Sequence, residues 1–334
     1  MIKSDETVDI KIMVSVYCLA YNHEKYIRHT LNGFVSQKTN FRYEVFVHDD
    51  ASTDNTASII QEYADKYPDI IKPIFQTENQ HSQKIPIIAT HILPKMSGKY
   101  IAACEGDDFW NDENKLQKQY DALEAHPECS ISTHKVQCCN EDGTPNSRII
   151  PEDYYKIHGT QKMDRKKFAE CLWVNGDYPF HTSSYFFRAK VMKEKVALVR
   201  DTAILMKSFI NGTVYYFDEA MSTRRLFSIG GFNDKLKKKG VSGSIELSKS
   251  NINNCRVFNE YTNNKYHKYT DYRIYTYIMS WAKYEPDEAK KYLSEYNLSF
   301  SKVSDIMPST KLKIKQGLKY FLLKVFPFIL KIFR

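Results

Sequence analysis

The first third of this chain alternates short apolar runs with segments whose apolar residues recur at helical spacing. The apolar runs occupy residues 12–18, 43–48, 70–75 and 100–103, and amphipathic helical patterns follow the first two. Repeated alternation of strand and helix is the pattern of parallel strands joined by helical crossovers. We therefore predict an α/β fold in which a doubly wound, mixed and mostly parallel sheet is flanked by helices.

Polar side chains directly follow three of these runs. Tyr21 follows the first run, Asp50 the second, and the acidic segment 105–108 the fourth. Ligands of open α/β sheets bind beyond the carboxyl ends of the strands, so we expect these groups in one crevice. Taken alone, residues 49–54 would be read as an Asp/Ser turn with a helix cap. Their convergence with the other two groups favours a binding site.

The acidic segment carries the carboxylates of Glu105, Asp107 and Asp108 at the end of an apolar strand. Carboxylates this close repel one another and raise one another's pKa. A hard divalent cation held by oxygen ligands, or a shared proton, relieves that repulsion. The segment therefore predicts a cation site.

The composition is that of a folded globular protein, with 42% hydrophobic and 26% charged residues among 334. The seven cysteines lack CxxC or Cys/His ligand spacing, which predicts a reducing, cytosolic setting without zinc. Residues 1–6 contain no apolar stretch of the kind that a secretory signal needs. We expect a cytoplasmic protein.

The formal charge of +8 is concentrated near the C-terminus, where residues 302–334 carry eight Lys or Arg and one acid. In residues 311–334 lysines interrupt the apolar positions, so the ~20 uninterrupted apolar residues of a spanning helix do not occur. This tail predicts peripheral attachment to an anionic membrane surface, with no nucleic acid as partner. The alternative is a helix packed on the domain or in a dimer interface.

Residues 14–22, 44–56 and 98–110 together resemble family 2 of the nucleotide-sugar glycosyltransferases. The resemblance covers roughly residues 12–230 and is specific because three motifs occur in order. It implies the GT-A fold and transfer with inversion of the anomeric configuration. It also implies a surface-polysaccharide role of the bacterial type, with a UDP-sugar preferred as donor.

The resemblance assigns three residues to the nucleotide base: Tyr21, Asp50 and, less closely, Glu24. It makes residues 105–108 the counterpart of the family's DxD-type motif. Asp107 or Asp108 would then ligate Mn²⁺ or Mg²⁺ on the diphosphate, with Glu105 facing the ribose or the donor sugar. The Glu at the first acidic position departs from the commoner Asp.

An inverting transfer needs a general base for the acceptor hydroxyl. The resemblance places that base at Asp201, before a helical segment whose N-terminus would keep the carboxylate ionised. Asp177 is the second candidate. The alternative for Asp201 is a helix N-cap and no more.

Further along, Arg225 matches the Arg of a Tyr-Arg pair in relatives and could hold a phosphate. Arg224 replaces the Tyr, and Phe227 replaces a His two residues after the Arg. His181 could line the acceptor side, although a lone loop His is more often structural.

We expect a catalytic GT-A domain over residues 1–230, a helical Tyr-rich region over 231–310 and a membrane-associating tail over 311–334. Residues 140–151 are expected to form a loop, and residues 235–240 a basic loop.

The predicted function is sugar transfer to a lipid-linked or polymeric glycan acceptor at the inner face of the cell membrane. Two alternatives remain at this point: a nucleotidyltransferase, which would release pyrophosphate, and a non-catalytic glycan-binding relative.

Overall fold

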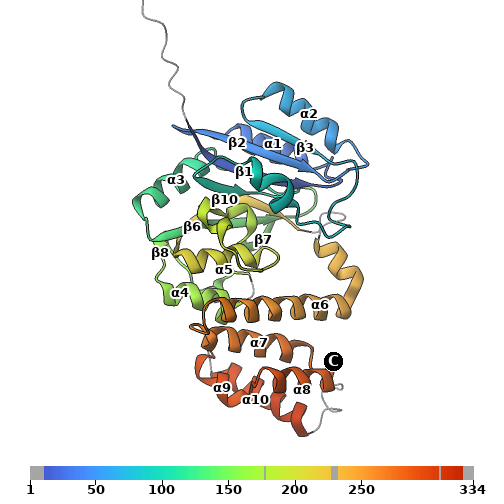
Figure 1. Ribbon diagram of the computed structural model, residues 1–334, viewed down its shortest axis with the longest axis vertical. Coiled ribbons are helices and arrows are strands. Elements are labelled where there is room, and N and C mark those ends of the chain that lie inside the picture. Colours follow the sequence, from blue (N-terminus) through green and yellow to red (C-terminus); the bar gives the residue numbers. More distant parts are fainter. Residues whose placement is uncertain (1–10, 177, 227–231, 308–309, 326–334) are drawn as a thin grey trace, which may run out of the picture. The chain divides into compact units, whose positions relative to one another are not determined.

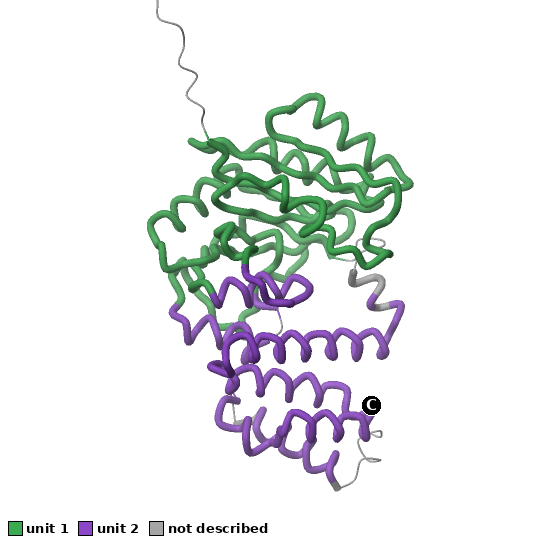
Figure 2. The backbone as a smooth tube through the Cα atoms, viewed as in Figure 1, with its two compact units in different colours: residues 1–163, 180–193, 211–230 green, residues 164–179, 194–210, 231–334 purple. Residues whose placement is uncertain are grey.

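The structure is a computed structural model that describes residues 11–176, 178–226, 232–307 and 310–325 (Figure 1). The chain divides into two compact units (Figure 2). Unit 1 comprises residues 1–163, 180–193 and 211–230, and unit 2 comprises residues 164–179, 194–210 and 231–334. Two segments from before residue 230 therefore pack with the C-terminal helices.

The described part of unit 1 contains a ten-stranded sheet. Its strands are β1 (Ile12–Ala20), β2 (Arg42–Asp49), β3 (Ile71–Phe75), β4 (Tyr100–Ala103), β5 (Phe109–Trp110), β6 (Cys129–Cys139), β7 (Pro145–Ile150), β8 (Gln161–Lys162), β9 (Phe186–Arg188) and β10 (Thr213–Arg225). The order is β3-β2-β1-β4-β9-β6-β10-β5, with β7 added on β6 and β8 on β10. The first four strands in this order are parallel, and antiparallel pairing begins at β9.

The apolar runs of the sequence form the buried strands of this sheet. Val14 and Val16 of β1 and Val45 and Val47 of β2 have no exposed surface, which is expected for parallel strands covered on both faces. The helices that accompany the sheet are α1 (Ile27–Val35), α2 (Thr56–Lys66) and α3 (Lys115–Ala125).

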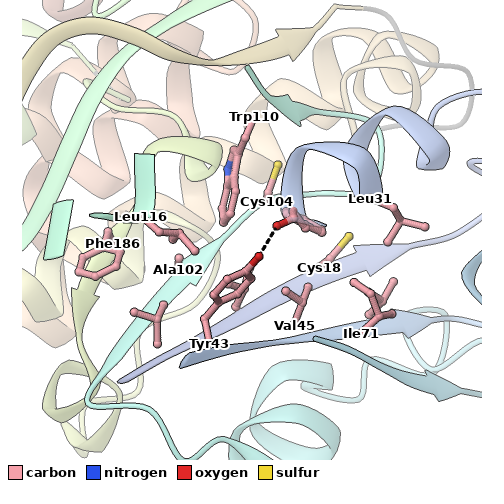
Figure 3. Packing of buried hydrophobic residues seen from close by; sticks show 14 of the residues in the cluster. Cys18, Leu31, Tyr43, Val45, Ile71, Ala102, Cys104, Trp110, Leu116 and Phe186 are labelled. Carbon is pink, nitrogen blue, oxygen red and sulfur yellow. Dashed lines mark hydrogen bonds between the residues drawn. The ribbon is translucent and has the colours of Figure 1, made fainter. Parts of the chain in front are cut away.

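Figure 3 shows the core around these strands, where Cys18, Val45 and Ile71 pack beneath Leu31 of α1. The hydroxyl of Tyr43 donates to the backbone carbonyl of Phe34 at 2.8 Å, so the phenol at the core edge is satisfied.

Unit 2 is helical. Its helices are α4 (Arg165–Ala169), α5 (Thr202–Asn211), α6 (Phe232–Tyr261), α7 (His267–Trp281), α8 (Pro286–Glu295), α9 (Phe300–Val303) and α10 (Thr310–Val325). Its core is aromatic: the centre of the Trp173 ring lies 5.0 Å from the ring centres of both Phe209 and Phe258. Helix α8 begins as capping rules predict, with Pro286 in its first turn followed by Asp287 and Glu288.

Two local expectations were wrong. Residues 235–239 are not a loop but helical; they lie in the first of the two helical segments of α6, which are separated by a kink at Gly240, where φ is +60°. The lysines there are good helix formers, and low apolar content alone does not break a helix. Residues 145–150, expected in a loop, form β7 against β6. Because β7 is an edge strand with mostly exposed side chains, its sequence lacks apolar alternation.

Among the described helices, none combines the length and the apolar character that crossing a bilayer requires.

Candidate functional site

The turns after β1 and β2 are fastened to each other. Asn22, at φ +55°, donates its backbone N–H to Ser52 Oγ at 2.9 Å, and its side-chain oxygen accepts from the N–H of Thr53 at 2.8 Å. Glu24 Oε2 accepts from both the backbone N–H and the side-chain amide of Asn55, each at 3.0 Å. The two turns therefore form one polar rim, from which Tyr21 remains 37% exposed.

Asp50 lies buried at the end of β2 and organises a third segment. Its Oδ1 accepts from the N–H of Gln80 at 2.7 Å and its Oδ2 from the N–H of His81 at 3.1 Å. The Asn79 side chain donates to the Asp50 carbonyl at 3.1 Å. Nothing in the sequence of residues 79–81 signals this role, because backbone amides, which every residue except proline carries, make two of the three bonds.

The acidic segment 105–108 forms a turn directly after β4. The Gly106 N–H donates to the Leu19 carbonyl at 2.9 Å, and the Asp108 N–H closes the turn on the Glu105 carbonyl at 3.1 Å. A Cβ on Gly106 would lie 2.7 Å from His23 Nδ1, so this close approach to the β1 turn requires glycine. The structure thus brings Tyr21, Glu24, Asp50 and the acidic segment to the same edge of the sheet.

The two aspartates of the segment differ in their surroundings. Asp108 is buried, and its Oδ1 accepts from the Arg225 N–H at 2.8 Å, while Asp107 is half-buried. Burial, and then the neighbouring Asp107, raise the pKa of Asp108 well above its usual value. The Nδ1 atom of His181 lies 3.7 Å from Asp108 Oδ2. Burial, and then the charge of Arg224, hold the pKa of His181 well below its usual value, so that this imidazole is neutral.

Arg225 anchors the acidic segment to the β6–β7 turn. Its Nε donates to the Asp107 carbonyl at 3.2 Å, and its Nη1 to the carbonyls of Glu141 at 2.5 Å and Asn140 at 3.4 Å. Its guanidinium also lies 4.8 Å from the centre of the Tyr26 ring. The sequence did not signal these backbone contacts, and phosphate binding by Arg225 stays a prediction.

Three further candidates are Asp201, Asp177 and Phe227. Phe227 and Asp177 are outside the described residues. Asp201 belongs to unit 2 and directly precedes α5, and its Oδ2 accepts from the Tyr178 hydroxyl at 3.3 Å. Its place before a helix agrees with the sequence pattern, and its role as the base stays a prediction.

The donor atoms of the site can be compared with those that a metal ion needs. No cluster of three or more His, Cys, Asp or Glu side chains suited to a metal occurs among the described residues. Mg²⁺ and similar ions are commonly held by one or two carboxylates together with substrate phosphates and water. A half-buried Asp107 in the acidic turn fits that donor set.

The parallel half-sheet, the linked turns and the acidic segment after β4 together define a GT-A glycosyltransferase fold. A family model described as "Glycosyl transferase family 2" matches residues 15–191, just over half of the chain. The chain therefore belongs to glycosyltransferase family 2.

Relatives agree with this assignment. An uncharacterized protein of Mycobacterium tuberculosis is 42% identical over 162 residues, which cover 47% of this chain and 44% of the relative. The putative glycosyltransferase EpsE of Bacillus subtilis is 33% identical over 138 residues, covering 41% of this chain and 48% of EpsE. The chain thus matches less than half the length of these relatives.

Solved structures show the same fold at low identity. Staphylococcus aureus TarS 1–349 in complex with UDP-GlcNAc has a TM-score of 0.56 at 16% identity, covering 94% of this chain and 90% of that one. A mannosyltransferase from Pyrobaculum calidifontis in complex with GDP-Man and Mn²⁺ has a TM-score of 0.51 at 15% identity, with coverages of 94% and 86%.

Proposed function

We propose that this protein transfers a sugar from a nucleoside diphosphate sugar to a hydroxyl group of a lipid-linked or polymeric glycan. The observation that carries the proposal is the joining of three polar segments at the carboxyl ends of β1, β2 and β4 in a family 2 chain. Relatives named for teichuronic acid biosynthesis and for poly(ribitol-phosphate) N-acetylglucosaminyl transfer support a surface-polysaccharide acceptor.

Each polar segment has a part in donor binding under this proposal. Tyr21 presents a partly exposed ring to the base, and Asp50 holds segment 79–81 while its remaining lone pairs accept from the base. Glu105 would bind the ribose or the donor sugar. We infer that Asp107 holds Mn²⁺ or Mg²⁺, whose charge would stabilise the departing diphosphate. Asp108, which accepts from the Arg225 N–H, would keep the acidic turn in place.

The transfer would proceed by direct displacement. Asp201 would accept the proton of the acceptor hydroxyl while the hydroxyl oxygen forms the new bond to the anomeric carbon. The bond from that carbon to the diphosphate breaks, and the nucleoside diphosphate leaves with the electron pair. A UDP-sugar is the preferred donor, and complexes of structural neighbours with UDP and UDP-GlcNAc support this choice. We also propose that the reaction takes place at the inner face of the membrane, where a lipid-linked acceptor would lie.

The test combines donor binding with turnover in the whole protein. We expect one nucleotide sugar to raise the melting temperature only with Mn²⁺ or Mg²⁺ present, and chelation by EDTA to abolish both this shift and release of the nucleoside diphosphate. Asp107→Asn should lower kcat/KM at least about a hundredfold. The product should carry the inverted anomeric configuration.

The matched control is Asp65→Asn on the exposed side of α2, which should leave binding and turnover unchanged. Failure of every nucleotide sugar to bind or react would contradict the proposal, and unchanged donor binding and turnover by Asp107→Asn would contradict the role of Asp107. Release of pyrophosphate from a nucleoside triphosphate would instead identify a nucleotidyltransferase.

A further inference from the structure

Helix α10 exposes an apolar stripe. Ile314 is 69% exposed, Leu318 57% and Phe321 53%, which makes them the three most exposed large apolar side chains in the described part of the chain. Their spacing of four and three residues places them on one helical face. Exposed apolar side chains gathered on one face are typical of interaction sites, whereas singly scattered ones are not.

The opposite face of α10 packs within unit 2. Leu323 is fully buried, and the Tyr275 hydroxyl of α7 donates to the Gln316 carbonyl at 3.4 Å. The rings of Tyr275 and Tyr320 lie 6.1 Å apart, and a Cβ on Gly317 would lie 3.2 Å from the Phe300 ring. The helix therefore already has its core-facing side, and the stripe is additional apolar surface.

Lysines border the stripe. Residues 310–325 contain five lysines and no acid. At 100° per residue, Lys315 falls on one flank of the stripe and Lys313 and Lys324 on the other. Positive groups gather on this part of unit 2. Burial lowers the pKa of Lys319, and the nearby charges of Lys315 and Lys283 lower it further.

We propose that the α10 stripe, Ile314, Leu318 and Phe321 with its flanking lysines, docks on an anionic lipid bilayer. The helix would lie parallel to the surface, with its apolar side chains among the acyl chains and its lysines at the lipid phosphates. A second copy of the chain fits less well, because a two-fold contact along the stripe would bring lysine flanks against lysine flanks. This inference rests on the proposed function and deepens it, since it supplies a docking face for an enzyme with a lipid-linked acceptor.

The experiment measures binding of the full chain to phosphatidylcholine vesicles, with and without phosphatidylglycerol, in the absence of any nucleotide sugar. We expect binding only to the vesicles that contain phosphatidylglycerol. The triple variant I314S/L318S/F321S should lose at least about a hundredfold in partition coefficient, since each side chain buries several carbons. The double variant K315Q/K324Q should lose about twentyfold, and added salt should reproduce this loss.

Ile149→Ser and Val199→Ser, at exposed apolar positions in other elements, are the matched controls and should bind as the wild type does. All variants should melt within a few degrees of the wild type, because exposed substitutions change stability little. Vesicle binding that the triple variant leaves unchanged would overturn the inference. A wild-type dimer that binds no vesicles, and that only the triple variant dissociates, would overturn it too. Sugar transfer is measured separately, so this outcome and failure of the proposed function are distinguishable.

Discussion

At the scale of single residues, Lys115 is an unusual group, a lysine with no exposed surface beside the acidic segment. Its Nζ donates to Gln119 Oε1 at 2.7 Å and lies 4.0 Å from the centre of the Trp110 ring. Burial lowers the pKa of this ammonium to about 7. Near neutral pH the folded protein therefore binds this proton less tightly than the unfolded chain does.

This difference predicts how stability depends on pH. An unfolded lysine has a pKa of about 10.4, so between pH 7 and pH 10 the unfolded state binds more protons, and the free energy of unfolding rises with pH. Lys115→Met removes this contribution. Relative to the variant, the wild type should gain up to about 1.4 kcal/mol per pH unit from pH 7 to 9, as measured by chemical denaturation.

The control is Lys25→Met, because Lys25 is exposed on the surface of unit 1. Its stability should follow that of the wild type at every pH. If the free energies of unfolding of Lys115→Met and the wild type changed with pH in parallel, the buried amine would be shown to keep its proton.

At the scale of elements, α1 packs against the acidic segment and holds it in place. The Thr30 hydroxyl lies 2.6 Å from the Asp108 carbonyl and 3.0 Å from the Gly106 carbonyl, so one side chain contacts two carbonyls of the turn. A Cβ on Gly33 would lie 2.6 Å from the Trp110 carbonyl, which shows how closely the helix approaches this part of the chain. The position of the carboxylates therefore depends on a helix that carries no candidate site residue.

Thr30→Val keeps the shape of the side chain and removes its hydroxyl. We expect a loss of about 1–2 kcal/mol in the free energy of unfolding, because two buried carbonyls lose a donor. Donor affinity, measured by thermal shift with metal present, should fall as well. Thr30→Ser retains the hydroxyl and should restore most of both quantities. Weak donor binding by the Ser variant, equal to that of the Val variant, would argue against a role for the hydrogen bond.

At the scale of the whole molecule, the seven cysteines are free thiols and all are buried. They are distributed over both units and serve as packing groups, as Cys18 and Cys104 do in the main core (Figure 3). Burial raises the pKa of Cys129 to about 11 and that of Cys171 to about 12, so neither forms a thiolate at neutral pH.

We expect a thiol reagent such as Ellman's reagent to titrate fewer than about one thiol per folded chain at neutral pH. All seven should react once denaturant unfolds the chain. Disulfide-linked chains in freshly reduced protein would contradict this picture, as would several fast-reacting thiols in the native state.

Much of the fold was predictable because its signals are local. The apolar run at residues 12–18 predicted β1, and the polar Asp201 before a helical pattern predicted the start of α5. The edge strand β7 and the helical lysines before Gly240 escaped prediction. The formation of β7 depends on pairing with β6. The lysines before Gly240 are helical without an apolar stripe, through helix propensity.

The sequence by itself determined the α/β alternation and the delivery of carboxylates to the strand ends, since both depend on spacing between near neighbours. Only the tertiary structure decided what each carboxylate does. Asp108 accepts from the backbone of Arg225, and Asp50 holds residues 80 and 81. Backbone N–H groups make these bonds, and that of Arg225 lies 117 positions from Asp108 in the chain. Because every residue other than proline carries the same N–H group, no local pattern distinguishes the ones that bind.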